Sequence, residues 1–490
     1  MSKSSNLLRY SGWNLAALVL PLLVGLVTIP YLLKQIGVER FGVLGIIWAL
    51  VGYFSLFDFG ISKALTKKLA EGRLDHNIQM QRKVFWTAMF LMLGLGVLGW
   101  LALYLLVQLA SGTFIKVSPD ISFEVNHAIL LIASFIPLVI VSAGLRGCLE
   151  AYEEFRASSV VRLALGVWMF LAPALASGLG HSSLSVLASV IVFGRVVAAL
   201  ISWELVANNM QGLGKPTFTK DLVRPLFSYG AWITLSGIIG PLLSYADRFL
   251  IGAIVGATGV AYYATPQDVA TKLLLLPVAI NTALFPLLAK EFSLVKFGRG
   301  KVLQLVTKSM AYALLGILPF SLLLIAFSLE LLTLWLGGEF ASRSALVLQL
   351  FAIGITASSV GIILIPILFA INKPAVVAKL YLVELPVFVI STIYLTNHYG
   401  IVGAAWAWML RSVLDTLLVW YFTARVCVEV KVIAQPILLL MVASIGFALL
   451  IGDLDSLVIK ISLFVVLCGA VLLFGYKKLL LPTTYVEVVA

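Results

Sequence analysis

Charged residues are scarce in this sequence. Asp, Glu, Lys and Arg make up 11% of the 490 residues, whereas 61% are hydrophobic; soluble domains carry roughly 25% charged residues. A soluble globule cannot bury that much apolar surface. Apolar runs of about 20 residues, each long enough to cross a ~30 Å hydrocarbon core, recur along the whole chain. The sequence therefore predicts an all-α polytopic membrane protein.

Cysteine and histidine are also rare, with three and four residues that lie far apart. Their spacing predicts neither a metal site nor a disulfide framework. The sequence contains no glycine-lysine loop of the Walker type, which disfavours ATP hydrolysis. The longest polar connections, 62–84, 205–226 and 289–302, have room for a short helix but not for a catalytic domain. We therefore predict a protein that is not an enzyme, and the short loops also disfavour a glycan polymerase or ligase.

Window hydropathy predicts about fourteen membrane spans. The apolar run that opens the chain is longer than the core of a cleavable signal and is taken as the first span. The predicted spans are 11–33, 42–61, 85–110, 127–146, 159–177, 184–204, 227–248, 257–288, 303–327, 344–371, 376–396, 401–424, 434–452 and 457–475.

One stretch of the sequence occurs twice. Residues 7–45 and 226–264 each open with aromatic residues, continue as an apolar span broken by proline, and turn at a glycine, which is Gly37 in the first copy and Gly256 in the second. Six spans separate the two starts, so both copies enter the membrane in the same direction, and their axis of repetition lies along the membrane normal. Two six-helix lobes around a central cavity are therefore expected, with two additional spans. The predicted divisions are 1–210, 211–430 and 431–490.

Basic residues predict the orientation, because cytoplasmic loops accumulate Lys and Arg. With the N-terminus inside, 25 Lys and Arg residues lie on the inner side and 6 on the outer side, and 3 lie within spans. Both termini are therefore predicted to be cytoplasmic. Topology and attraction to anionic lipid headgroups account for most of the +12 net charge without nucleic acid.

Charges within or at the ends of spans are the candidate functional residues, because each is costly in hydrocarbon unless it is paired or hydrated. We predict that the basic members line a substrate-binding cavity and that the acidic members couple to an ion or tune the charge. The basic candidates are Arg146, Arg195, Arg248, Lys272 and Arg411, and the acidic candidates are Asp58, Asp247, Asp268, Glu384 and Asp415.

Alternative roles remain open for several of these candidates. Asp268 with Lys272, and Arg411 with Asp415, are four residues apart, so each pair shares a helix face and could form an internal salt bridge. Arg195 has no local partner and is either an interhelical bridge or an anion ligand. Three others, Asp58, Arg146 and Arg248, lie near the predicted interface, where snorkelling or capping is the alternative.

Four segments carry a family resemblance: IGVERFGVLGIIWAL and FSLFDFGISKALTKKLAE at the first two spans, SYADRFLIGAIVGATGVAYYATPQDVA at spans seven and eight, and WLGGEFASRSALVLQLFA before span ten. With its span count and layout, the chain resembles the Wzx-type oligosaccharide lipid flippases. These form the polysaccharide transporter family of the multidrug/oligosaccharidyl-lipid/polysaccharide exporter superfamily. The motifs are glycine and aromatic patterns without a catalytic signature.

The resemblance implies a flippase of the bacterial inner membrane that moves a polyprenyl-pyrophosphate-linked oligosaccharide, such as an O-antigen, capsule or exopolysaccharide repeat unit, to the outer leaflet by alternating access. It implies no cofactor, although coupling to H+ or Na+ stays open. A polysaccharide polymerase and a chain-length regulator are implied as partners, besides membrane lipids. The alternatives are a lipid II flippase and a MATE-type cation-coupled drug antiporter.

Overall fold

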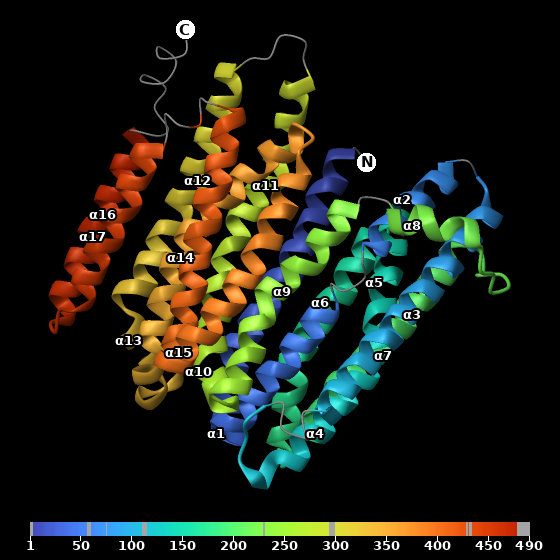
Figure 1. Ribbon diagram of the computed structural model, residues 1–490, viewed down its shortest axis with the longest axis horizontal. Helices are drawn as coiled ribbons and strands as arrows, with labels where there is room; N and C mark the ends of the chain where they lie inside the picture. Colours follow the sequence, from blue (N-terminus) through green and yellow to red (C-terminus); the bar gives the residue numbers. More distant parts are fainter. Residues whose placement is uncertain are drawn as a thin grey trace. The chain divides into compact units, whose positions relative to one another are not determined.

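The computed structural model describes residues 3–55, 60–74, 76–109, 115–228, 231–293, 299–427, 430 and 434–477. In this part of the chain every regular element is a helix (Figure 1). The predicted all-α class is confirmed. Eleven of the fourteen predicted spans fall on a single helix, although the second ends at Phe54 rather than residue 61. The other three, 127–146, 227–248 and 257–288, each extend over two or three helical elements.

The chain divides into two compact units, Met1–Ala261 and Tyr262–Ala490. This division lies later in the chain than the predicted lobe boundary at residue 210, because α9 also packs on α1. The lobes of the repeat therefore stay a prediction. The first unit contains α1 (Lys3–Phe54), α2 (Ile61–Leu74), α3 (Ile78–Leu109), α4 (Pro119–Ser134), α5 (Ile136–Ala151), α6 (Phe155–Gly178), α7 (Leu184–Asn209), η1 (Lys220–Leu222), α8 (Val223–Ser228) and α9 (Ala231–Ile254).

The second unit begins within α10 (Ala257–Thr271). Its most buried helix is α14, which packs against α11, α12, α13 and α15. The core of the unit is a continuous apolar cluster that extends from α11 to α17. Its remaining elements are η2 (Lys272–Leu274), α11 (Leu275–Ser293), α12 (Arg299–Ala326), α13 (Ser328–Leu336), α14 (Gly338–Ala370), α15 (Pro374–Val426), α16 (Ala434–Gly452) and α17 (Leu457–Gly475).

Two helices are too long for one crossing of the membrane. A helix of about 20 residues spans the hydrocarbon core, but α1 has 52 residues and α15 has 53. Each is interrupted by one non-helical glycine, Gly37 with φ 78° and Gly400 with φ 59°. Positive φ is readily adopted only without a Cβ atom. Each of these helices therefore supplies two of the predicted spans, joined by a glycine turn.

The repeated stretches share this turn. Gly256, the predicted equivalent of Gly37, also has positive φ, 109°, and lies between α9 and α10. Both glycines end one apolar helix and allow the next to begin. The predicted turn at a glycine in each copy is thus confirmed. Next to Gly256, the Ala257 amide donates a hydrogen bond to the Lys116 carbonyl at 3.1 Å.

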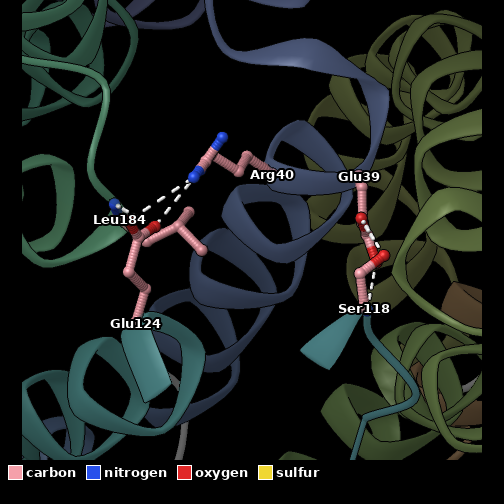
Figure 2. Close-up of polar contacts among 5 residues, drawn as sticks. All are labelled: Glu39, Arg40, Ser118, Glu124 and Leu184. Atoms are coloured by element: carbon pink, nitrogen blue, oxygen red, sulfur yellow. Dashed lines mark hydrogen bonds and ion pairs between the residues drawn. The ribbon is translucent and has the colours of Figure 1, made fainter. Parts of the chain in front are cut away.

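Polar side chains hold the α1 turn against neighbouring helices (Figure 2). Glu39 accepts hydrogen bonds from the backbone amide of Ser118 at 2.6 Å and from its hydroxyl, just before α4 begins. Arg40 pairs with Glu124 of α4 at 3.2 Å, and the same carboxylate accepts a bond from the first amide of α7, at Leu184. The motif residues Glu39 and Arg40 therefore tie the start of three helices together.

Gly403, just after the α15 turn, has no room for a larger side chain. A Cβ atom at Gly403 would lie 2.0 Å from the Leu395 carbonyl oxygen across the turn. We expect Gly403→Ala to lower the unfolding free energy by roughly 1–3 kcal/mol, because the backbone must shift to relieve the overlap. Thermal unfolding of the detergent-solubilised protein measures this change.

Gly446 in α16 is the matched control, because nothing lies within 4 Å of a Cβ built there. We expect Gly446→Ala to leave the melting temperature unchanged or to raise it, since alanine favours the helix by about 1 kcal/mol over glycine. Equal melting temperatures for the two variants would contradict the close approach at Gly403.

Candidate functional site

Nine of the ten candidate residues lie in the described part of the chain, and Asp58 lies outside it. They form separate groups rather than one cluster within a unit. Because the two units are described separately, each group is considered within its own helices.

The first group is a pair of arginines in the first unit. Arg146 near the end of α5 and Arg195 in the middle of α7 are both half-buried, and α5 packs against α7. The Arg195 guanidinium is close enough to that of Arg146 to be repelled by it. Within the described ranges no carboxylate or other hydrogen-bond acceptor contacts the Arg195 guanidinium. Among the described residues, no interhelical bridge to Arg195 is formed.

This arrangement favours an anion. Two like charges brought together in low dielectric repel each other strongly, and an anion between them would reverse the sign of that energy. The guanidinium group offers five N–H donors in a planar fork that matches phosphate oxygens. Of the candidate residues, Arg195 is thus the best placed to bind a phosphate group.

The second group is Asp247 and Arg248 on α9, both buried, with 0% and 5% exposure. The Asp247 carboxylate accepts a hydrogen bond from the Arg248 amide at 2.9 Å. The Arg248 guanidinium lies over the Tyr245 ring, 5.8 Å from its centroid. This burial argues against snorkelling to the interface, which was the alternative for Arg248.

Asp268 and Lys272 do not form the predicted salt bridge within the described residues: no ion pair within 4.0 Å joins them. Asp268 is half-buried on α10, and Lys272 is exposed at the start of η2. The helix changes at Thr271 from 3.6 to 3.0 residues per turn. The Thr271 hydroxyl donates to the Gln267 carbonyl at 2.7 Å at this change.

The third group lies on the two arms of α15. Glu384 is on the first arm and is 2% exposed, and Arg411 and Asp415 are on the second arm and half-buried. These residues interact electrostatically, because the turn at Gly400 folds the arms back and places positions at similar distances from it side by side. The sequence predicts the Arg411 and Asp415 pair but not the partnership with Glu384 across the turn.

Several polar atoms of Glu384, Arg411 and Asp415 have no ion-pair or hydrogen-bond partner among the described residues. No ion pair within 4.0 Å joins Arg411 to Asp415 among the described residues; the guanidinium lies instead over Phe388 and Trp408, at 5.1 and 5.8 Å. The carboxyls of Glu384 and Asp415 lie near each other. In the described part of the chain, both Glu384 oxygens, one Asp415 oxygen and Arg411 Nε are buried without a hydrogen-bond partner.

An ion pair of a buried lysine, outside the candidate set, was missed. Lys460, which the loop count assigns to an outer connection, lies in α17, is 4% exposed and pairs with Glu330 of α13. Its ammonium is also 5.4 Å from the Phe327 ring centroid. The sequence does show a single lysine inside the apolar run 457–475, which indicates a buried charge. It does not show that the partner of this lysine lies 130 residues away. The pair fixes α17 to α13.

Another polar cluster lies at the start of α3. Arg82 donates hydrogen bonds to the Gly212 and Gln211 carbonyls, at 2.9 and 2.8 Å, and so holds the segment that follows α7. The Tyr152 hydroxyl donates to Gln81. Burial, and secondarily the nearby Cys148, raise the pKa of Tyr152 to about 12, so this phenol stays protonated and a donor at neutral pH.

Metal binding finds no support in this part of the protein. Within the described ranges no three His, Cys, Asp or Glu side chains are grouped to hold a metal ion. The candidate residues that the structure describes are charged groups distributed over several helices.

The sequence matches the model of a known protein family. Residues 7–292, more than half of the chain, match the family described as "Polysaccharide biosynthesis protein". The chain belongs to this family. The matched region includes the first repeat, the α1 turn and both buried arginine groups.

Relatives of this polysaccharide biosynthesis protein agree with the assignment. It is 29% identical over 424 residues to a "Putative O-antigen transporter" of Shigella flexneri, covering 86% of this chain and 99% of the relative. It is 25% identical over 393 residues to "Probable low-salt glycan biosynthesis flippase Agl15" of Haloferax volcanii, covering 80% and 78%. The fold resembles that of a lipid II flippase MurJ structure, with TM-score 0.68, 13% identity and coverage of 97% and 100%.

The cluster on α15 generates a stability prediction for this family member. Arg411 is the cation next to two buried carboxyls, so we expect Arg411→Leu to destabilise the protein by about 3 kcal/mol, because it leaves buried acidic groups uncompensated. Adding Asp415→Asn to the same chain should recover part of the loss. Fluorescence-detected thermal unfolding gives both values.

Arg425→Leu is the control, because Arg425 is exposed near the end of the same helix and lies over Tyr421. Its expected effect is within about 0.5 kcal/mol. A loss for Arg411→Leu no larger than for Arg425→Leu would show that the cation does not compensate the carboxyls.

Proposed function

We propose that the protein is a flippase that moves a polyprenyl-pyrophosphate-linked oligosaccharide from the inner to the outer leaflet by alternating access. Membership of the polysaccharide biosynthesis family, an O-antigen transporter and a glycan flippase among the relatives, and the many apolar helices all support the proposal. The single observation that carries it is the half-buried Arg195 guanidinium without an acidic partner in the described residues.

The chemistry of this cargo explains why a cation belongs inside the protein. A pyrophosphate pays a large free-energy penalty in hydrocarbon, and charge-assisted hydrogen bonds from arginine offset that penalty. In this proposal Arg195 and Arg146 attract the pyrophosphate in the first unit, with Arg248, Lys272 and Arg411 as further cations along the path. The glycan follows through a hydrated cavity, and the tail remains in lipid.

The acidic cluster on α15 is the proposed coupling element. Two buried carboxyls facing one arginine can accept a proton or a monovalent cation, and the bound cation would satisfy oxygens that now lack a partner. Asp247, Asp268 and Asp58 tune the charge along the same path. Membrane lipids surround the protein, which we place in the bacterial inner membrane, and a polymerase with its chain-length regulator would take up the exported repeat units.

Arg195 provides the test of transport. Purified protein in liposomes with a labelled lipid-linked oligosaccharide should expose the glycan to an impermeant glycosidase added outside. We expect Arg195→Ala to slow this exposure by about tenfold or more, since a hydrogen bond to a charged group contributes ~1.5–3 kcal/mol. Arg195→Lys should fall between the two, because it keeps the charge but loses the fork.

Arg343→Ala is the control, because Arg343 is exposed and pairs with Glu339 on the same helix. It should transport within about twofold of the unchanged protein, as expected for an exposed pair. Equal rates for Arg195→Ala and Arg343→Ala would remove Arg195 from the site. No exposure by the unchanged protein would refute the flippase itself.

The basic residues predict which loops face the cytoplasm. In a background without the native cysteines, we expect Glu339→Cys to react with a membrane-impermeant maleimide in right-side-out membranes. Lys215→Cys should react only after permeabilisation, because it lies in one of the lysine-rich loops assigned to the inner side. Both side chains are exposed, so folding does not hide either site. Labelling in the reverse order would invert the proposed orientation.

A further inference from the structure

The segment before α4 forms hydrogen bonds to a distant part of the first unit. The Lys116 amide donates to the Gly252 carbonyl at 3.0 Å, and the Lys116 carbonyl accepts a bond from the Ala257 amide at 3.1 Å. The Lys116 ammonium donates to the Ile254 carbonyl at 2.8 Å. We name these three contacts the Lys116 latch. They hold the turn at Gly256, between α9 and α10.

The Lys116 latch supplies partners that two helix ends lack. The last carbonyls of a helix and its first amides have no partner within the helix. Gly252 and Ile254 belong to the last turn of α9, and Ala257 is the first residue of α10. A cation at the end of a helix also interacts favourably with the helix dipole. Lys116 therefore satisfies backbone groups of both helices at this turn.

Glycines allow α1 to approach the same turn closely. On the second arm of α1, a Cβ atom at Gly42 would lie 1.8 Å from the Ala257 carbonyl oxygen. A Cβ atom at Gly252 of α9 would lie 3.0 Å from Ile46 Cδ1 of α1. The Lys116 latch thus lies at the end of a tightly packed seam between α1 and the α9–α10 turn.

The segment that carries the Lys116 latch also contacts the α1 turn. Ser118, two residues after Lys116, donates hydrogen bonds to the Glu39 carboxylate from its amide and its hydroxyl (Figure 2). Lys116 and Ser118 are both exposed, so water can replace their hydrogen bonds when these break. Contacts of this kind suit a junction that opens and closes.

The two sides of the Lys116 latch belong to different halves of the repeat. Lys116 lies in the predicted lobe 1–210, and the α9–α10 turn lies in the predicted lobe 211–430. The first compact unit nevertheless extends to Ala261, because α9 packs against α1. An opening between the two halves of the repeat at this end must therefore break the Lys116 latch.

We propose that the Lys116 latch closes the outer end of the transport path and opens in each transport cycle. The role in transport rests on the proposed function, and the outer location rests on the predicted orientation, in which Lys116 and the Gly37 turn face outward. Alternating access requires the two ends of the path to open in turn. Backbone groups make most of the latch, and its one charged group is exposed, so opening leaves no buried charge unpaired.

Reversible cross-linking tests whether the latch must open. In the full-length chain without native cysteines, Lys116→Cys and Val255→Cys place two thiols at the latch, because Val255 is exposed next to Gly256. A short bis-methanethiosulfonate reagent joins the thiols, and a reductant releases them. We expect the linked protein to expose no more glycan in liposomes than protein-free vesicles do. Reduction should restore the rate of the unlinked double variant.

Lys67→Cys with Glu71→Cys is the control, because both side chains are exposed and lie four residues apart on α2, so a link between them restrains one helix only. This variant should transport equally with and without the link. Transport at the unlinked rate by the protein linked at positions 116 and 255 would overturn the proposal. So would failure of the reagent to join positions 116 and 255 while it joins 67 and 71, because the two sides would then not meet.

Labelling at the seam measures opening without transport. Ile46 is 1% exposed and lies against α9, so Ile46→Cys, added to the double variant, reacts with a maleimide only when the seam opens. We expect the link to slow labelling at position 46 by about tenfold or more, because it removes an open state that is ~0.1–10% populated in such equilibria. Mass spectrometry gives the labelling rate at this position.

Equal labelling rates with and without the link would show that the seam does not open at the latch and would overturn the proposal. If the unchanged protein transports nothing, the proposed function fails, and the labelling at position 46 still decides whether the latch opens.

Discussion

Hydrocarbon cannot hydrogen-bond to a peptide group, and the architecture depends on this constraint. A chain that crosses the bilayer repeatedly must pair its amides and carbonyls within helices. Changes of direction are then confined to places where the backbone can turn within a few residues. Gly37, Gly256 and Gly400 provide three such turns, each with positive φ. The same constraint favours short connections, so the candidate functional side chains lie on helices rather than on loops.

Charge is the second quantity that the bilayer restricts, and the protein treats it in three ways. Lys460 and Glu330 pair directly and fix one helix to another. Glu384, Arg411 and Asp415 lie across the two arms of α15, and within the described residues several of their polar atoms have no hydrogen-bond partner. Arg195 has a second arginine rather than an acid as its electrostatic neighbour. The first arrangement suits permanent structure, whereas the other two leave an energetic deficit that a proton, a cation or an anionic lipid would remove.

Much of the fold could be predicted from the sequence, because length and apolar composition fix where a helix crosses a membrane. The terminal spans 434–452 and 457–475 match α16 and α17 residue for residue. The turns at Gly37 and Gly256 were also predictable, from a repeat of low identity, whereas Gly400 was not. Partners distant in sequence were not: Glu384 meets Asp415 only because α15 folds at Gly400, and Lys460 meets Glu330 across 130 residues. Spacing on one helix left the Asp268 and Lys272 pair open, and the two form no ion pair among the described residues.

The turn at Gly400 also bears on how the protein enters the membrane during synthesis. The two arms of α15 are joined at a single glycine rather than by a long loop, so they can partition into lipid together as a helical hairpin. Inserted one at a time, the first arm would carry Glu384 into hydrocarbon alone, and the second would carry Arg411 and Asp415. Inserted together, the acidic and basic groups meet as they leave water. A glycine in the middle of a 53-residue helix thus lets the charged groups of its two arms enter the membrane together.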